Sequence, residues 1–439
     1  MSVASELLVT GYGAVTGAGD ELAFRKLWLE GSSAVRPFEN GHEGLPPGYG
    51  AAVPWKHKEL RALPGGRGMR PGTMTASTFL AVGAVGRALA NGGIEDPGAQ
   101  EPEVAERRGV YIGSYTNFPA LKKHLKLVHI MGDLEAARVG EYRQDDARIM
   151  GGMKGFTGFD FLKLMNNMPT AHGAIQANGR GPANTFMGYS SVGLQTLSRA
   201  CDALRLGLAD QFVAGACGPG TMEGLTLVHA AHGMLSDAGI EPSAAARPLD
   251  QEATGLVPGD GAAALIIETE GSASSRGARP VARIVAARDL FVAPTSPRGP
   301  MADSSGIVRL LRGLLDEAGW QPTDVDYLAA TGAGLASLDR LEAEAYGEVF
   351  GAHLAQLYLA VHTGVLGFTE AAHGPIGVVG ALQAMEDGLL PPHYNLDAPH
   401  PGLEGMRRVA APEPAEVRRA LAVSLAPEGT LSALALEAC

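Results

Sequence analysis

The chain has 439 residues, of which 46% are apolar and 19% are charged, a balance that is typical of a folded globular protein and argues against disorder. The formal net charge of −12 disfavours nucleic acid as a partner, and no apolar run approaches the ~20 residues that a membrane span needs. Three widely spaced cysteines give no disulfide framework, which favours a reducing, cytoplasmic compartment.

Short apolar runs that are typical of buried strands recur along the chain, and several are rich in β-branched residues. They are residues 7–10, 109–112, 211–214, 262–267, 281–285, 325–330, 357–362 and 421–424.

Helical patterns lie between these runs. Residues 76–90 are small and apolar nearly all round, which predicts a buried helix. Residues 192–206 are amphipathic, and Gly207 follows them as a stop signal. Residues 307–318 and 374–388 are further helices. This alternation of strands and helices predicts α/β layers with helices packed on sheets.

Two other stretches bear on organisation. Residues 270–279 (EGSASSRGAR) are the best candidate for an internal joint, since no charge block or low-complexity linker divides the chain. Residues 119–155 form a long polar insertion that contains Lys122, Lys123 and Lys126. We expect a solvated surface helix there, with a docking patch for an acidic partner as the alternative.

Four segments resemble, in chain order, the β-ketoacyl synthases of the thiolase-like superfamily. Residues 9–20 are similar to their first strand and turn, and 179–216 to the segment that carries the nucleophile. Residues 247–268 resemble their Arg-Pro-Phe-Asp stretch, and 377–399 resemble their late helix and Pro-Pro turn. The resemblance implies an α/β thiolase-like fold of two similar halves in a five-layer α-β-α-β-α core. It also implies a dimer whose nucleophile strands lie near the interface.

We assign these halves to residues 1–270 and 271–439. Family chemistry needs a cysteine nucleophile at a helix N-terminus and two histidines that assist decarboxylation and stabilise an enolate. Each motif is present here, but each lacks its residue. Ser190 stands at the cysteine position, Thr331 at the first histidine and Phe368 at the second, while Thr363 replaces an upstream lysine.

The glycine-rich loop of the family appears here as SLAPEGTL, starting at Ser424. In the family, one backbone N–H of the oxyanion hole comes from the position that Pro427 occupies, and proline has no N–H. Losing one such donor costs roughly 10²–10³ in rate. Catalytic groups act as a unit. Losing the nucleophile, both histidines and one oxyanion donor is therefore expected to leave little function beyond substrate binding.

This degenerate set most resembles the chain-length factor, the ketosynthase-like second subunit of type II polyketide synthases. The run DRLEAEA at 339–345 is also similar to that subfamily, although chain-length factors usually carry glutamine where this chain carries Ser190. The resemblance implies a heterodimer with an active ketosynthase, an acyl carrier protein as carrier, and a role in shaping the product cavity. Alone, such a subunit is expected to be inactive in condensation.

Alternatives stay open for the site residues. Ser190 either caps a helix or lines a pocket, or it is the nucleophile of an acyltransferase or hydrolase, with His362 and His373 as nearest candidate bases. Thr331 and Phe368 fill the vacated site, or alternatively Phe368 and Tyr189 shape or block a channel. A homodimeric acyl-binding protein is a third possibility for the whole chain.

We expect no cofactor and no metal. His229 and His232 have the spacing of metal ligands on one helix face, but no third ligand is evident. Cys201 and Cys217 lie in apolar runs and are interpreted as inert core thiols, with Cys439 exposed.

Overall fold

The computed structural model describes residues 6–38, 48–54, 57–115, 158–163, 165–236, 239–293 and 301–439. The polar insertion at 119–155, with its three lysines, lies outside the described residues. Among the described helices, none combines the length and apolar character that crossing a bilayer requires.

Most described strands belong to one 11-stranded sheet, whose path runs β11-β10-β14-β15-β9-β1-β8-β7-β5-β6. The strands on this path are β1 (Leu7–Thr16), β5 (Arg108–Ser114), β6 (Ala183–Met187), β7 (Gln211–Pro219), β8 (Asp260–Thr269), β9 (Ala282–Phe291), β10 (Tyr327–Ala329), β11 (Tyr358–Ala360), β14 (Arg419–Leu425) and β15 (Thr430–Ala438). The short β2 (Gly19–Asp20) pairs with β1. Two small sheets pair β3 (Arg36–Phe38) with β4 (Gly48–Gly50) and β12 (Leu389–Leu390) with β13 (Glu413–Pro414).

The long path consists of two strand sets with the same plan. In the first set β6, β5 and β7 are parallel, and β8 and β1 follow antiparallel. In the second set β11, β10 and β14 are parallel, and β15 and β9 follow antiparallel. The sets meet where Leu8 and Val9 of β1 pair with Arg283 and Ala282 of β9. The prediction of two similar α/β halves is therefore confirmed.

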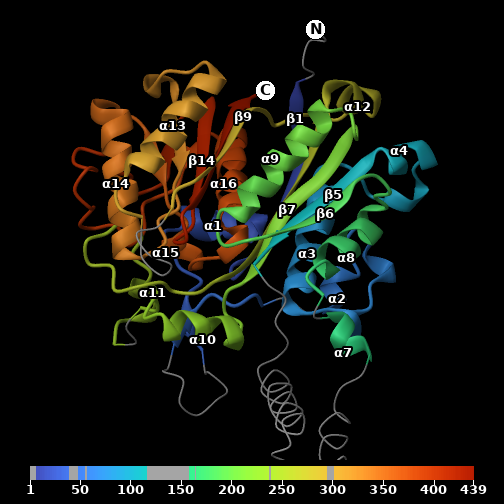
Figure 1. Cartoon of the computed structure of the whole chain (residues 1–439), viewed down its shortest axis with the longest axis horizontal. Coiled ribbons are helices and arrows are strands. Elements are labelled where there is room, and N and C mark those ends of the chain that lie inside the picture. The colour runs from blue at the N-terminus through green and yellow to red at the C-terminus, as the bar shows by residue number, and fades with distance from the viewer. Residues whose placement is uncertain are drawn as a thin grey trace, which may run out of the picture.

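Helices form three layers around these strands (Figure 1). The outer helix α3 (Ala76–Asn91) packs on β1, β7 and β8 and on α8 (Met168–Ala177). On the opposite side, α13 (Ser305–Ala318) packs on β9 and β15 and on α14 (Ala336–Phe350). Between them, α9 (Val192–Arg205) and α16 (His373–Asp387) contact each other and strands of both sets. This is the predicted five-layer core.

The remaining helices are short or peripheral. They are α1 (Glu21–Leu29), α2 (His57–Leu60), α4 (Pro102–Glu106), α7 (Gly158–Lys163), α10 (Glu223–Ala231), α11 (Pro242–Ala245), α12 (Glu270–Ser275), α15 (Thr363–Leu366) and the 3-10 turn η6 (Glu370–Ala372).

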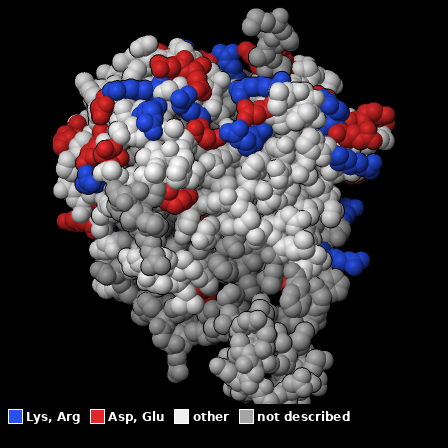
Figure 2. All heavy atoms as spheres, in the orientation of Figure 1, with Lys and Arg blue, Asp and Glu red and all other residues white. Residues whose placement is uncertain are grey.

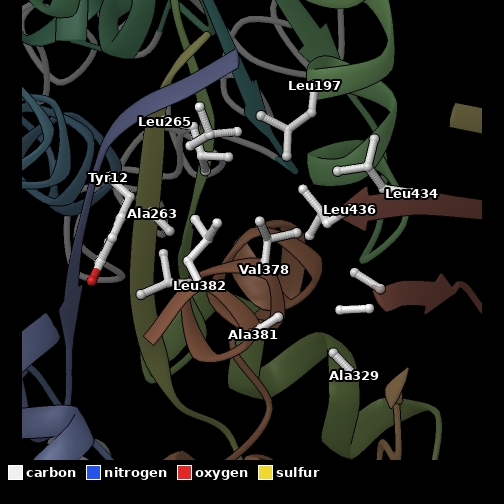
Figure 3. Close-up of a cluster of buried hydrophobic side chains, with 14 of the residues drawn as sticks. Tyr12, Leu197, Ala263, Leu265, Ala329, Val378, Ala381, Leu382, Leu434 and Leu436 are labelled. Atoms are coloured by element: carbon white, nitrogen blue, oxygen red, sulfur yellow. The ribbon is translucent and has the colours of Figure 1, made fainter. Parts of the chain in front are cut away.

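The middle layer is dry and tightly packed because its sequences supply small and apolar side chains. Figure 3 shows Val378 and Leu382 of α16 among Leu197 of α9, Leu265 of β8 and Leu436 of β15. A Cβ atom on Gly374 would lie 2.5 Å from Leu194 Cγ, so the close approach of α9 and α16 requires glycine there. This packing fixes the start of both helices, where the motif positions lie.

Candidate functional site

The motif positions lie at the ends of elements that surround the middle layer. Tyr189 and Ser190 come just before α9, Thr331 follows β10, and Phe368 precedes η6 and α16. Pro427 lies in the turn between β14 and β15. The fold thus brings segments that are distant in sequence to one place.

Ser190 is buried, and its hydroxyl donates a hydrogen bond to the backbone of β14. Its Oγ donates to the Leu425 carbonyl at 2.8 Å, and Ser424 Oγ donates to the Ser190 carbonyl at 2.9 Å. The N-cap residue of α9 is Ser191, and it makes no side-chain cap bond. The helix-cap interpretation of Ser190 is therefore wrong, because its hydroxyl ties the start of α9 to β14 instead.

Thr331 links the end of β10 to the same strand. The Leu425 backbone N–H donates to Thr331 Oγ1 at 3.0 Å. The Thr331 carbonyl accepts from Thr363 Oγ1 at 3.3 Å and from His373 Nε2 at 2.7 Å. Ser190, Leu425, Thr331 and His373 thus form one hydrogen-bonded series.

The contacts of His373 fix its tautomer. A carbonyl oxygen only accepts, so Nε2 carries the proton and Nδ1 holds the lone pair. Nδ1 lies 3.5 Å from Thr369 Oγ1. Burial lowers the pKa of His373 to about 4, so the ring is neutral at physiological pH. The hydrogen bond that the Ser190 hydroxyl donates goes to the Leu425 carbonyl and not to a histidine.

Aromatic rings complete the centre. His362 stacks on His373 with ring centroids 4.2 Å apart, and Phe368 packs against His373 at 4.8 Å. His362 also meets the edges of Phe24 and Trp28. Burial lowers the pKa of His362 well below its usual value, and the neighbouring His373 lowers it further. The two histidine rings at the centre are therefore buried and uncharged at physiological pH.

Two acidic side chains hold the loop that carries Thr331. Glu342 accepts from the backbone N–H groups of Thr331 and Gly332 at 2.7 and 2.9 Å. Asp339 accepts from Ala333 and Gly334 at 2.9 and 3.0 Å. Both carboxyls belong to the DRLEAEA run, whose first and fourth residues thus act as backbone anchors.

Pro427 lies in a tight turn, in which the Gly429 backbone N–H donates to the Ala426 carbonyl at 2.9 Å. The next residue is Glu428, which is half-buried and whose carboxyl lies near Tyr189 at the start of α9. Burial raises the pKa of Glu428, while hydrogen bonds from the Thr430 hydroxyl and the Tyr189 backbone N–H oppose that rise. The turn thus combines a missing N–H donor with an added carboxyl.

Tyr189 lies beside this carboxyl and is half-buried. Its ring packs against Tyr115 with centroids 4.4 Å apart. Burial raises the pKa of Tyr189, and hydrogen bonding with Tyr115 and the nearby Glu370 and Glu428 raise it further. Tyr189 is therefore a neutral phenol that covers one side of the site.

Sequence reasoning missed Glu370 and its contact with His229. Both side chains are buried, and His229 Nε2 lies 3.2 Å from Glu370 Oε1. Burial and the nearby Glu428 raise the pKa of Glu370 to about 8. Burial and His232 lower the pKa of His229 to about 4. Between these values both groups are neutral, so the contact is not an ion pair.

Glu370 also has a backbone φ of 53°, in the left-handed region. Such a conformation costs a non-glycine residue about 1–3 kcal/mol and is concentrated at functional sites. One signal in the sequence could have identified Glu370, because it lies two residues after Phe368 in the second histidine motif.

The metal-like histidine spacing does not build a metal site. His229 is buried against Glu370, whereas the exposed His232 places Nδ1 2.7 Å from the Val228 carbonyl. The described residues contain no group of three or more histidine, cysteine, aspartate or glutamate side chains placed to hold a metal. Cys201 and Cys217 are buried and free, and Cys439 is exposed and free.

The chain matches the family models "Beta-ketoacyl synthase, N-terminal domain" over residues 4–273 and "Beta-ketoacyl synthase, C-terminal domain" over residues 292–397. It is 31% identical, over 312 residues, to the tetracenomycin polyketide synthase ketoacyl synthase beta subunit of Streptomyces glaucescens. That alignment covers 69% of this chain and 74% of the relative.

Solved structures agree on the fold. The ishigamide ketosynthase/chain length factor superposes over 100% of both chains with a TM-score of 0.82 and 21% identity. A type II polyketide synthase ketosynthase in complex with its acyl-carrier protein, AntDE:AntF, superposes over 100% of both chains with a TM-score of 0.79 and 21% identity. At this identity the likeness concerns the thiolase-like fold alone.

Proposed function

The chain belongs to the β-ketoacyl synthase family, and we propose that it is a non-condensing member, a chain-length-factor-type subunit that pairs with an active ketosynthase. The observation that carries this proposal is the state of the catalytic centre. Ser190, Thr331 and Phe368 stand where condensation needs a thiol and two imidazoles, and Pro427 removes an oxyanion donor.

The surroundings of the centre also oppose anionic chemistry. Decarboxylation of a malonyl group generates an enolate, which needs hydrogen-bond donors or positive charge nearby. Here both histidines in the centre are neutral, and the titratable groups around it include the carboxyls of Glu342, Glu370 and Glu428. Neutral imidazoles bring no positive charge to the place where an enolate would form.

The alternative of an acyltransferase or hydrolase needs a base in contact with Ser190. The Ser190 hydroxyl instead donates to the Leu425 carbonyl, and the lone pair of His373 lies at Thr369. A serine without a base in reach is a weak nucleophile. We therefore favour the partner-subunit function over Ser190 catalysis.

The edge of the first strand set is the surface that we assign to the partner. β6 ends the sheet path, and Met187 at its end is 52% exposed. Ile175 on the neighbouring α8 is 70% exposed. Figure 2 shows few charged side chains over this part of the face, while lysine, arginine, aspartate and glutamate gather above it. Among the described strands β6 has a neighbour on one side only, and apolar edges of this kind promote association.

We propose that an active ketosynthase binds at this edge. The alternative partner is a second copy of this chain. In support, the ishigamide structure is described as a ketosynthase/chain length factor, and the S. glaucescens relative is a ketoacyl synthase beta subunit. An acyl carrier protein would deliver the chain mainly to the partner, and the AntDE:AntF structure is itself a complex of an acyl-carrier protein with its ketosynthase.

Three further points belong to the proposal. Tyr189 and Phe368 would help to shape the product cavity, because both rings border the vacated centre. The chain divides near α12, into residues 1–270 and 271–439. The free state of all three cysteines fits a reducing, cytoplasmic location.

The test is co-expression with the active ketosynthase encoded beside it, with an affinity tag on this chain alone and native mass measurement of the purified complex. We expect a one-to-one heterodimer that Met187→Glu weakens at least tenfold. The matched control is Leu22→Glu, because Leu22 is 66% exposed on α1, beside β1 at the opposite end of the same strand set. A homodimer that ignores the ketosynthase would refute the pairing.

A further inference from the structure

A polar cavity of about 580 Å³ lies between α4 and α12, at the end of the first strand set where β5 and β7 begin (Figure 1). Gln100, Arg107, Gln211 and Arg276 are among the residues that line it. Among the lining residues that the structure describes, Val104 alone has a large apolar side chain. The cavity therefore suits a hydrophilic ligand better than an acyl chain.

This cavity is separate from the vacated centre. β5 and β7 run parallel from Arg108 and Gln211, which pair with each other. The far end of β7 adjoins the centre, since a Cβ on Gly218 would lie 2.2 Å from the Thr369 carbonyl oxygen. The seven residues of β5 span roughly 20 Å at about 3.3 Å per residue. A ligand in the cavity would therefore not touch the motif positions.

Arg108 lies directly behind the wall of this cavity and is 0% exposed. Its guanidinium donates to the side-chain oxygens of Gln100 and Gln211 and, at 2.7 Å, to the Ala177 carbonyl. All three acceptors are neutral. Burial lowers the pKa of Arg108 to about 10, so the side chain remains a cation at physiological pH. A buried cation whose direct partners are all neutral is unfavourable for stability and requires an explanation.

One buried carboxylate, Glu268, serves two arginines. Arg276 Nε donates to Glu268 at 3.1 Å, and Gln211 Nε2 donates to it at 2.9 Å. Glu268 raises the pKa of Arg108, whereas the charge of Arg276 lowers it. Two positive charges thus share one negative charge, which leaves one net positive charge beneath the cavity.

We propose that this cavity binds a hydrophilic organic monocarboxylate, whose negative charge compensates the buried charge of Arg108. Because Gln100 Oε1 accepts from Arg108, the amide nitrogen of Gln100 lies on the opposite side of the amide group. It can donate there to a ligand carboxylate. Arg276 lines the same cavity, and its charge attracts the same group.

The rim of the cavity selects a ligand with a single negative charge. Arg107 and Asp210 form an ion pair at 2.7 Å and together contribute no net charge. Glu103, also on the rim, is exposed and would repel a second negative charge on the ligand. The hydroxyl-bearing residues Thr269 and Ser275 line the cavity and favour a ligand that carries hydroxyl groups. The cavity thus fits a hydroxylated monocarboxylate better than a phosphate dianion.

The test uses the purified full-length chain and two probes, D-gluconate and sorbitol, with sodium chloride holding the ionic strength constant. Gluconate has a carboxylate where sorbitol has a hydroxymethyl group. Calorimetric titration should give at least ~10-fold tighter binding of gluconate, the effect of about one charge-assisted hydrogen bond. Arg108→Met removes the buried charge and should reduce this ratio to below about twofold.

Gln100→Glu is the sharper variant, because it places a carboxylate of the chain itself against Arg108. It should raise the midpoint of urea unfolding above that of the wild type and also reduce the gluconate preference to below about twofold. Because Gln100 is partly exposed, this variant covers the case in which Arg108→Met does not fold.

Arg312→Gln is the matched control, since it removes an exposed arginine from α13 in the other strand set and should leave the ratio unchanged. Equal binding of gluconate and sorbitol by the wild type would overturn the site. Inorganic phosphate that binds as tightly as gluconate would overturn the assignment to a monocarboxylate. A preference that survives both Arg108→Met and Gln100→Glu would show that the buried charge has no part in binding.

Discussion

Replacing Glu370 by glutamine should change how stability depends on pH. The folded chain raises the pKa of this carboxyl from 4.5 to about 8, so between these values the folded state keeps a proton that the unfolded state releases. Stability from this group is therefore fully present at low pH and is lost as pH rises toward 8. The shift corresponds to about 5 kcal/mol at most, at about 1.4 kcal/mol per pH unit.

The useful window lies between pH 6.5 and 8. His229, which faces Glu370, has a lowered pKa of about 4, so its own contribution rises with pH and is complete near pH 6.5. Across the remaining 1.5 units the wild type should lose about 2 kcal/mol more than Glu370→Gln.

Urea unfolding followed by circular dichroism at several pH values measures this difference. Glu103→Gln, at an exposed carboxyl on α4, is the control and should follow the wild type. Equal pH slopes for the wild type and Glu370→Gln would refute the reasoning, because Glu370 would then titrate alike in both states.

Two predictions concern the centre itself. Thr331→Val should destabilise the chain by about 1–3 kcal/mol in urea unfolding, because it leaves the buried Leu425 N–H without its acceptor. Thr331→Ser should restore most of that loss, and equal values for the two variants would contradict the assigned bond. Phe368→Leu should shift the products of the reconstituted complex toward longer chains, as read by mass spectrometry. An unchanged product distribution would exclude Phe368 from the cavity wall.

The sequence predicted the framework of the site well because its motifs are local. Ser190, Thr331 and Phe368 were found by register within short segments, and the structure brings all three segments together. The middle helices were also predictable, since small residues and apolar periodicity are visible without tertiary information. The 374–388 pattern became α16 with boundaries one residue away.

Other features depend on contacts that no single segment reveals. β6 was not among the predicted strands because its residues Ala183 to Met187 are mostly exposed and show no alternation. The predicted strand at 357–362 stops at Ala360 because His362 is the N-cap residue of α15. The Glu370–His229 pair joins η6 to α10, and neither residue stands out in its own segment.

The central claim is tested most directly by the intact masses of both subunits after the purified complex has been loaded from an acylated carrier protein. The account predicts an acyl adduct on the active ketosynthase alone, with the mass of this chain unchanged and product formation unaffected by Ser190→Ala. An adduct on this chain that Ser190→Ala removes together with product formation would contradict it.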